Sequence, residues 1–173
     1  LGHVVVDEAT YLQEVNKLVI EGNLNDEDWS TMTKMVNLTE VDLSGVALET
    51  VPGSAFSGRW AIDKVVLPAS VKEIGGSAFK STGLRSINLP EGLTRIGSES
   101  FRYVPFETLN LPDSLEQIGS YAFSGNYKLK SVDIPQKITA IPYNCFSGCN
   151  QLESVTLPDG LVSIGDYAFS GDE

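Results

Sequence analysis

The sequence predicts a solenoid of short repeats, an α/β repeat fold with a parallel sheet on one face. Phenylalanines recur every 22 or 23 residues, at Phe56, Phe79, Phe101, Phe123, Phe146 and Phe169. Prolines keep the same phase, at Pro68, Pro90, Pro112, Pro135 and Pro158. Two residue types held in one phase over five or more copies indicate stacked structural repeats rather than an accident of composition.

Each repeat is expected to contain one short strand that a proline ends. Ile87 and Leu89 alternate with polar residues, which is typical of a strand with one buried face. Pro90 then ends the strand, because proline cannot donate a ladder hydrogen bond. Every coil travels the same way around the solenoid, so the strands should pair in parallel. The repeat phenylalanine should close each coil and fill the space between neighbouring coils.

Two glycine positions predict turns of different kinds. The first position follows an isoleucine, at Gly75, Gly97, Gly119 and Gly165. Pro52 and Pro142 occupy it in other repeats, so we expect a tight turn that needs neither an N–H donor nor a positive φ. The second position follows Phe-Ser, at Gly58, Gly125, Gly148 and Gly171. No proline replaces glycine there, and we expect a positive φ.

Residues 1–37 depart from the repeat and are expected to form an N-terminal cap of short strands and helices. Residues 38–173 then hold about six repeats of 22–23 residues, truncated at the C-terminus. Within the cap we expect a strand over residues 4–6, a helix from Asp7 over Ala9, Leu12 and Val15, and a further strand at Leu18 and Ile20. A second helix, capped by Asn25 or Asp26, should carry Trp29, Met32 and Met35.

The two ends of the chain bear on its targeting. The sequence starts at Leu1 without a methionine and stops shortly after Phe169, just before the next strand is due. We therefore expect it to be a piece of a longer protein, so the absence of a targeting signal says little about its compartment.

Composition excludes several classes of function. The formal net charge of -11 argues against binding to nucleic acid or to anionic lipid, both of which attract basic surfaces. No apolar run approaches the roughly 20 residues of a membrane-spanning helix, so direct insertion is not expected. His3 is the single histidine, and no phosphate-binding glycine loop is present. We therefore expect no enzyme activity, no cofactor and no metal.

Two cysteines lie four residues apart. Cys145 takes the small-residue position before Phe146, where a thiol behaves as a small buried apolar group. Cys149 lies in the turn that follows. Free structural thiols, a disulfide within the turn and a metal or catalytic role all remain open at this point.

Candidate binding residues fall into two sets. One column of strand residues should point outward from the sheet, and its polar members are Asp42, Asn88, Asn110, Asp133 and Thr156. These side chains either face solvent or form a hydrogen-bonding ladder for a protein or glycan. The second set is aromatic, with Trp60, Tyr103 and Tyr127 following the repeat phenylalanine. They either shield one edge of the solenoid or anchor a partner there, whereas Tyr121 and Tyr167 share a column and are interpreted as structural.

The repeat L-x-x-[IV]-x-[LI]-P-x-x-[LVI]-x-x-I-[GP]-x-x-[AS]-F resembles the BspA-like class of leucine-rich repeats over residues 38–173. The resemblance implies a right-handed leucine-rich-repeat solenoid, with a parallel sheet on its concave face and an N-terminal capping unit. Members of this family are secreted or surface-anchored proteins of Bacteroidetes, and some bind host matrix proteins or other cells. An extracellular or cell-surface location and a protein partner, such as an extracellular-matrix or host-surface protein, are therefore implied. The motif residues are structural, so no binding site carries over.

The leading hypothesis is a non-enzymatic recognition or adhesion module that binds a protein of a host or neighbouring cell. The second hypothesis is a glycan-binding module of a polysaccharide-utilisation surface protein, for which exposed aromatics such as Trp60 would supply the contacts. The third is a passive structural spacer, for which neither surface should matter.

Overall fold

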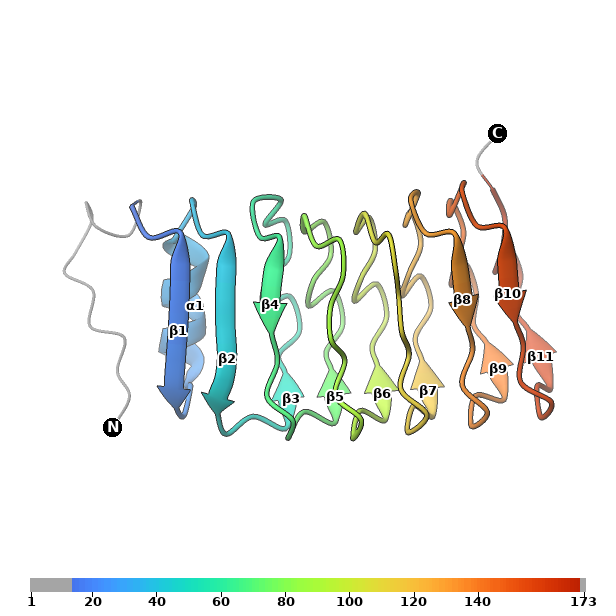
Figure 1. Ribbon diagram of the computed structural model, residues 1–173, viewed down its shortest axis with the longest axis horizontal. Helices are drawn as coiled ribbons and strands as arrows, with labels where there is room; N and C mark the ends of the chain where they lie inside the picture. Colours follow the sequence, from blue (N-terminus) through green and yellow to red (C-terminus); the bar gives the residue numbers. More distant parts are fainter. Residues whose placement is uncertain (1–13, 172–173) are drawn as a thin grey trace.

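The computed structural model describes residues 14–171. In this part of the chain, the coils of a solenoid stack along its long axis (Figure 1). The elements in chain order are β1 (Lys17–Gly22), α1 (Asp26–Lys34), β2 (Glu40–Val46), β3 (Thr50–Val51), β4 (Lys64–Val66), β5 (Glu73–Ile74), β6 (Arg95–Ile96), β7 (Gln117–Ile118), β8 (Ser131–Asp133), β9 (Ala140–Ile141), β10 (Ser154–Thr156) and β11 (Ser163–Ile164). The repeat periodicity therefore predicted the architecture correctly.

Two columns of parallel strands run along the solenoid. The first column holds the sheet β1-β2-β4 and the pair β8-β10, and the second holds the sheet β3-β5-β6-β7 and the pair β9-β11. Pairing joins equivalent residues of successive coils, such as Val41 with Val65 and Ile74 with Ile96. The predicted parallel pairing is confirmed. The second column was not predicted, because its strands are only two residues long.

The first column is interrupted in its middle. Residues 84–90 and 106–112 form no strand, although Ile87 and Leu89 are buried and Asn88 between them is exposed. The N–H of Glu107 donates to the carbonyl of Arg85 at 2.9 Å and links the two segments. The expectation of a strand in every repeat is therefore wrong at these two coils. Alternating burial requires only the core, whereas a strand also requires a hydrogen-bond ladder with the adjacent coil.

Five-residue segments centred on each repeat phenylalanine carry an unusual backbone, and we call them the αL segments: residues 54–58, 77–81, 99–103, 121–125, 144–148 and 167–171. The first residue of every segment has a positive φ, and all six are non-glycine: Ser54, Ser77, Glu99, Tyr121, Asn144 and Tyr167. The last residue also has a positive φ in five segments, at Gly58, Ser81, Tyr103, Gly125 and Gly148. The expected positive φ is thus confirmed for three glycines, whereas Gly171 does not show it.

Hydrogen bonds between coils hold the αL segments together. The N–H of Phe101 donates to the carbonyl of Ala122 at 2.9 Å, and the N–H of Tyr103 donates to the carbonyl of Ser124 at 2.8 Å. Equivalent bonds recur from coil to coil. These segments therefore form a ladder that lies outside both strand columns. Together with the continuous pairing of β5, β6 and β7 in the second column, it keeps the coils in register where the first column is interrupted.

The glycines after the repeat isoleucine are needed because neighbouring coils approach closely. A Cβ on Gly119 would lie 2.3 Å from the nitrogen of Ser98, and one on Gly97 would lie 2.7 Å from the nitrogen of Gly76. None of these glycines has a positive φ, as expected. Pro52 and Pro142 occupy this turn without a donor. Glycine uses its N–H where it is present, since the N–H of Gly119 donates to the carbonyl of Ile96 at 2.8 Å.

The repeat phenylalanines form a continuous stack inside the solenoid. Successive rings lie 5.2 to 5.6 Å apart between centroids, with interplanar angles of 16° or less. Trp29 of α1 meets the first ring, Phe56, edge-on at 5.8 Å. Phe169 ends the stack and is 38% exposed. A single aromatic column therefore runs through the largely aliphatic core, and α1 closes it at the N-terminal end.

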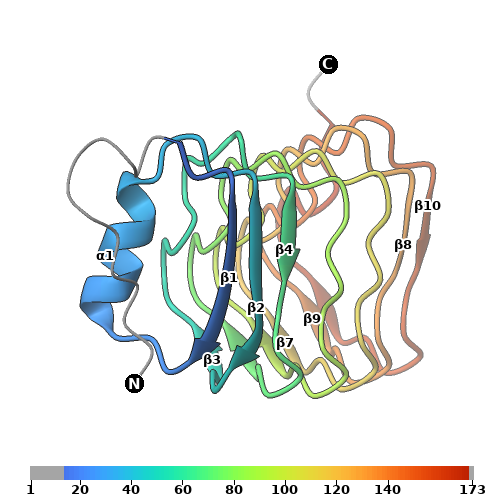
Figure 2. The same cartoon turned by 60° about the vertical axis from the view of Figure 1, so that its left-hand side comes forward.

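The described part of the N-terminal unit contains β1 and α1. Asn25 begins α1, and its side chain accepts hydrogen bonds from Glu27 N and Asp28 N, while Asp28 accepts one from Asn25 N. This reciprocal arrangement satisfies N–H groups that a helix start leaves unpaired. Met35 follows the helix rather than lying within it. Figure 2 shows α1 at the N-terminal end of the coil stack, beside β1.

The strand predicted at Leu18 and Ile20 is β1, which pairs with β2. The strand predicted over residues 4–6, the start of the helix predicted from Asp7, and His3 lie outside the described residues. Val15, the last residue of that predicted helix, is described and is not helical.

Arg59 joins the cap to the first repeat. Its guanidinium donates to the carbonyls of Met32 (3.0 Å), Thr33 (2.9 Å) and Met35 at the end of α1. The last carbonyls of a helix have no partner within the helix, and a cation is favoured beside them. Arg59 directly follows the first αL segment, so these bonds hold α1 against the first coil.

Candidate interaction surface

The polar strand column lies on the outer side of the first sheet column, as predicted. Asn88, Asn110, Asp133 and Thr156 are exposed, and Asp42 is half-buried. The register places Asp133 beside Thr156 in β8 and β10. Asn88 and Asn110, by contrast, lie on the two segments without strand structure. The column is therefore exposed but is not one continuous ladder.

Charges occupy the N-terminal end of this surface. The carboxylate of Glu40 lies 3.4 Å from the ammonium of Lys17 and 3.6 Å from that of Lys64, so it bridges β1, β2 and β4. Hydrogen bonds from the Ser44 side chain and N–H lower the pKa of the Asp42 carboxyl. The exposed polar groups at this end therefore contact one another, which leaves them less free to bind a ligand.

Two surface depressions flank Asn88. One, of about 530 Å³, lies between β4 and residues 86–88, and the other, of about 310 Å³, lies between residues 87–91 and 110–112. Both coincide with the interruption of the first column. Their linings combine apolar, charged and amide side chains, and they contain no aromatic ring on which a sugar could stack.

The three aromatics predicted as anchors are all exposed, but they do not touch one another. Trp60 is 60%, Tyr103 43% and Tyr127 47% exposed. Gly83 and Pro105 occupy the coils between Trp60 and Tyr127 in the same column. Tyr103 instead lies over Gly125, where an added Cβ would meet its ring at 2.4 Å. They are therefore separate exposed side chains rather than a row.

A different set of aromatics does form a continuous surface, on the αL segments and on Tyr143, which directly precedes one of them. The ring of Tyr143 meets those of Tyr121 and Tyr167 edge-on, at 5.3 and 6.0 Å between centroids. The guanidinium of Arg102 lies 4.7 Å from the ring of Tyr103 and 4.8 Å from that of Tyr121. We call these five residues the tyrosine strip.

Much of the strip is open to solvent. Tyr103, Tyr143 and Tyr167 are 43%, 42% and 65% exposed. Sequence columns alone did not reveal it, because Tyr143 is one position out of phase with Tyr121 and Tyr167. The interpretation of Tyr121 and Tyr167 as purely structural therefore needs revision: Tyr121 is half-buried, but Tyr167 is largely exposed.

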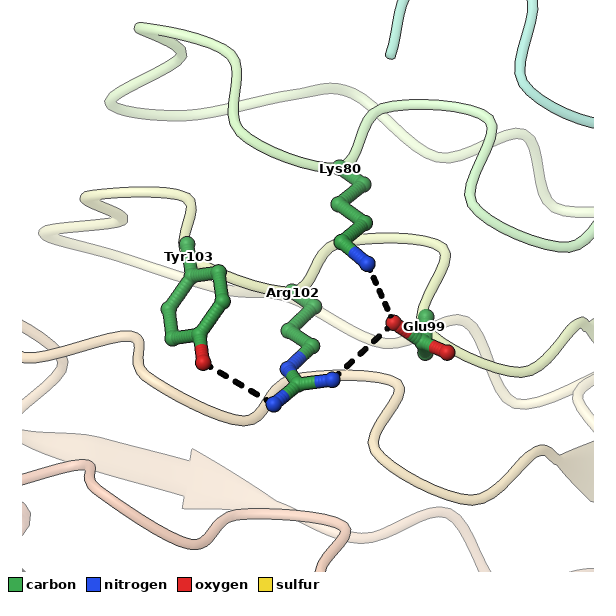
Figure 3. A network of polar contacts seen from close by, with 4 residues as sticks. All are labelled: Lys80, Glu99, Arg102 and Tyr103. Atoms are coloured by element: carbon green, nitrogen blue, oxygen red, sulfur yellow. Dashed lines mark hydrogen bonds and ion pairs between the residues drawn. The ribbon is translucent and has the colours of Figure 1, made fainter. Parts of the chain in front are cut away.

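A polar network adjoins the strip (Figure 3). Glu99 receives hydrogen bonds from Lys80 at 2.6 Å and from Arg102 at 3.1 Å, and Arg102 also donates to the hydroxyl of Tyr103 at 2.9 Å. The bonds from Lys80 and Arg102 lower the pKa of the Glu99 carboxyl. A hydrogen bond with the Tyr143 side chain raises the pKa of Tyr121. The network therefore holds Arg102 in place between two tyrosine rings.

The two cysteines are free thiols in the core. Both are buried, and the thiol of Cys149 donates to the carbonyl of Phe123 at 3.3 Å. Asn126 occupies the same repeat position and donates to the carbonyl of Phe101 at 2.8 Å. Burial raises the pKa of both thiols, that of Cys149 to about 12. A protonated, buried thiol is a poor nucleophile and metal ligand.

Neither a cluster of metal-ligating side chains nor a helix able to span a membrane occurs in the described part of the chain. Across residues 14–171, no three His, Cys, Asp or Glu side chains gather in a way that would hold a metal ion. Over the same span, none of the helical structure is both long and apolar enough to cross a bilayer.

Comparisons with known proteins agree with the fold. The structure is similar to a leucine-rich repeat protein from Bacteroides ovatus, with 32% identity and a TM-score of 0.71, over 76% of this chain and 40% of that one. It is also similar to a leucine-rich repeat protein of T. pallidum, with 32% identity and a TM-score of 0.66, over 76% and 62% of the two chains. This chain therefore spans less than two thirds of either relative.

A leucine-rich cell surface protein from Faecalibacterium prausnitzii shares the fold, with 21% identity and a TM-score of 0.60, over 92% of this chain and 58% of that one. No curated protein matches the sequence. The family model described as a BspA type leucine-rich repeat region matches residues 9–105 and 72–173, in six copies. The chain belongs to the BspA-type leucine-rich repeat family.

Proposed function

We propose that this chain is a non-enzymatic recognition module that binds a protein partner outside the cell, as part of a surface or secreted protein. The observation that carries the proposal is the tyrosine strip. Tyrosine and arginine are enriched among residues that dominate binding energy, because each offers a large contact area together with polar groups. Four tyrosines and one arginine in continuous contact on a rigid solenoid fit such a role.

The family and the neighbours support the extracellular location. Leucine-rich repeats present extended surfaces for interaction, and the Faecalibacterium prausnitzii neighbour is described as a cell surface protein. Adhesion to a host or neighbouring cell is the specific form that we favour. The two cysteines are buried and their thiol pKa values are raised, which makes them poor nucleophiles and supports binding rather than catalysis.

The proposal is tested by binding of the purified protein to arrays of extracellular-matrix proteins and complex glycans. One variant replaces Tyr121, Tyr143 and Tyr167 by Asn, Ser and Asn, residues that other coils carry at the same positions. A matched control replaces Asn88 and Asn110 by alanine in the first sheet column. We expect saturable binding to a protein that the tyrosine variant loses and the asparagine variant keeps.

The other outcomes distinguish the competing functions. If only the asparagine variant loses binding, the binding surface is the first sheet column rather than the tyrosine strip. A glycan ligand lost with Trp60→Ala would favour the carbohydrate-binding hypothesis. The absence of any ligand on both arrays would favour a passive spacer.

A further inference from the structure

We infer that the tyrosine strip binds an extended acidic segment of the partner protein, with a partner carboxylate beside Lys80 and Arg102 and partner apolar residues on Tyr121, Tyr143 and Tyr167. This inference rests on the function proposed above. It adds the chemical class of the partner and the orientation in which it lies.

The αL segments beside the strip carry one more cation than carboxylate. Lys80 and Arg102 both contact the same carboxylate, that of Glu99. These three are the charged residues of the αL segments, where two cations and one anion give a net charge of +1 at the Arg102 end of the strip, while the exposed Asp166 precedes Tyr167 at the opposite end. The whole chain has a formal net charge of -11. A partner with carboxylates is therefore repelled by most of the molecule and attracted to this part of it.

The strip has the shape of a site for an extended chain. It runs along the solenoid axis from the coil of Phe101 to the coil of Phe169, which is three steps of about 4.8 Å each. An extended segment of four or five residues, at about 3.3 Å per residue, covers that length. The edge-on contacts of Tyr143 with its neighbours alternate ring faces and ring edges along this line. Apolar side chains of such a segment would pack on the exposed surface of the rings.

The backbone provides a separate argument that the tyrosines serve more than the fold. Tyr103, Tyr121 and Tyr167 have φ values of 59°, 59° and 57°, a region that bulky residues rarely adopt. Asn144 and Gly125 occupy the same repeat positions elsewhere in the solenoid, and both tolerate this region better. Three tyrosines therefore stand where the backbone favours smaller residues, as expected for side chains retained for an external contact.

The test uses a phage-displayed library of random peptides of about 12 residues, selected on the purified protein. The selected peptides are then synthesised with a fluorophore, and their affinity is measured by fluorescence anisotropy. We expect enrichment of peptides that combine Asp or Glu with apolar residues. Their binding should weaken about tenfold or more with Tyr121→Asn/Tyr143→Ser/Tyr167→Asn, and in about 0.5 M sodium chloride.

Two further variants separate charge from folding. Lys80→Ser/Arg102→Ser introduces the residue that other coils carry after the phenylalanine, at Ser57, Ser124, Ser147 and Ser170, and should also weaken acidic peptides about tenfold. Asn88→Ala/Asn110→Ala should leave their affinity unchanged. Equal unfolding midpoints for all variants show that binding, rather than the fold, is affected.

Each contrary result is decisive. Selected peptides without an acidic excess would overturn the inference, as would acidic peptides that bind the tyrosine variant as tightly as the wild type. A library that yields no specific peptide would overturn it too. If the tyrosine variant no longer binds an array protein while the selected peptides show no acidic bias, the proposed function stands and the inference of an acidic partner is wrong. Heparin that competes with the array protein at the strip would identify a sulfated glycan instead and overturn the inference.

Discussion

The ring of Phe79 stacks on the ring of Phe101 at 5.2 Å between centroids, with the two planes within 2° of parallel. Both side chains are fully buried. The separation is close to the spacing of adjacent strands, about 4.8 Å. Ring stacking and strand pairing therefore favour the same distance between successive coils. Ring stacking thus adds to the pairing of β5, β6 and β7 and to the αL ladder in keeping the coils in register where residues 84–90 and 106–112 form no strand.

Truncation of a ring in the middle of the stack should therefore destabilise the whole solenoid. Phe101→Ala removes contacts with Phe79, Phe123 and Phe106 and leaves a cavity, at a cost of about 3–5 kcal/mol in the free energy of unfolding. The same change at Phe169, which is 38% exposed and has one ring neighbour, should cost less than half as much. Urea denaturation followed by circular dichroism measures both, and equal costs would contradict a packed stack.

Arg59→Ala should loosen the helical cap. The substitution removes three charge-assisted hydrogen bonds to the carbonyls at the end of α1, and we expect a loss of about 2–3 kcal/mol. Arg59→Lys keeps the charge but cannot span three carbonyls, so its loss should be intermediate. Hydrogen exchange measured by mass spectrometry should show that Arg59→Ala speeds exchange, relative to the wild type, more in α1 than in β8 or β10. Uniform acceleration along the chain would indicate that Arg59 does not act through the cap.

Close approach of the coils predicts opposite results for two glycines. Gly119→Ala places a methyl group 2.3 Å from the nitrogen of Ser98, so the backbone must move and stability should fall by about 1–3 kcal/mol. Gly160 has nothing within 4 Å of its added Cβ and a φ outside the left-handed region. Gly160→Ala should therefore leave stability unchanged or raise it by up to about 1 kcal/mol. Thermal unfolding midpoints compare the two, and a tolerated Gly119→Ala would show that neighbouring coils can separate.

The αL backbone predicts that glycine stabilises one serine position and destabilises another. Ser81 has a φ of 57° and shares its repeat position with Gly58, Gly125 and Gly148. Ser81→Gly should raise stability by up to about 1 kcal/mol, because glycine adopts this region without a Cβ clash. Ser98 is exposed and has no positive φ, so Ser98→Gly should lower stability by about 0.5–1 kcal/mol. Chemical denaturation gives both values, and the same sign for both would argue against the backbone explanation.

Particular residues show how far the sequence could predict this structure. The periodic phenylalanines predicted the core stack because each has the same neighbours in every coil, and Asn25 predicted the start of α1 because a helix start has strong local preferences. The contact of Arg59 with α1 was not predicted. The residues at its repeat position in the next three coils are Thr82, Val104 and Asn126, and none of these coils has a helix beside it.

The tyrosine strip was missed for a geometric reason. Tyr143 lies one residue out of phase with Tyr121 and Tyr167, and only the left-handed backbone brings the three rings into contact. The sequence pattern did not predict the interruption of the first strand column either. Ile87 and Leu89 alternate as strand residues do, yet hydrogen bonding between coils depends on both partners.

The buried thiols predict how stability depends on pH. Burial raises the pKa of Cys149 from 9.0 in the unfolded chain to about 12, and burial also raises the pKa of Cys145. Above pH 9 the unfolded state therefore loses thiol protons that the folded state keeps, so the free energy of unfolding should fall as the pH rises. Below pH 9 both states are protonated and the thiols cause no pH dependence.

Cys145→Ala/Cys149→Ser is the matched variant for this prediction. Alanine fills the Cys145 position in other coils, at Ala78 and Ala122, and serine retains a donor for the carbonyl of Phe123. Urea midpoints measured between about pH 8 and pH 10 should decline more steeply for the wild type than for the variant. At about pH 8, a thiol reagent should label both cysteines only after denaturation, because the folded thiols are buried and protonated. Rapid labelling of the folded protein, or identical pH slopes, would show that the thiols are exposed.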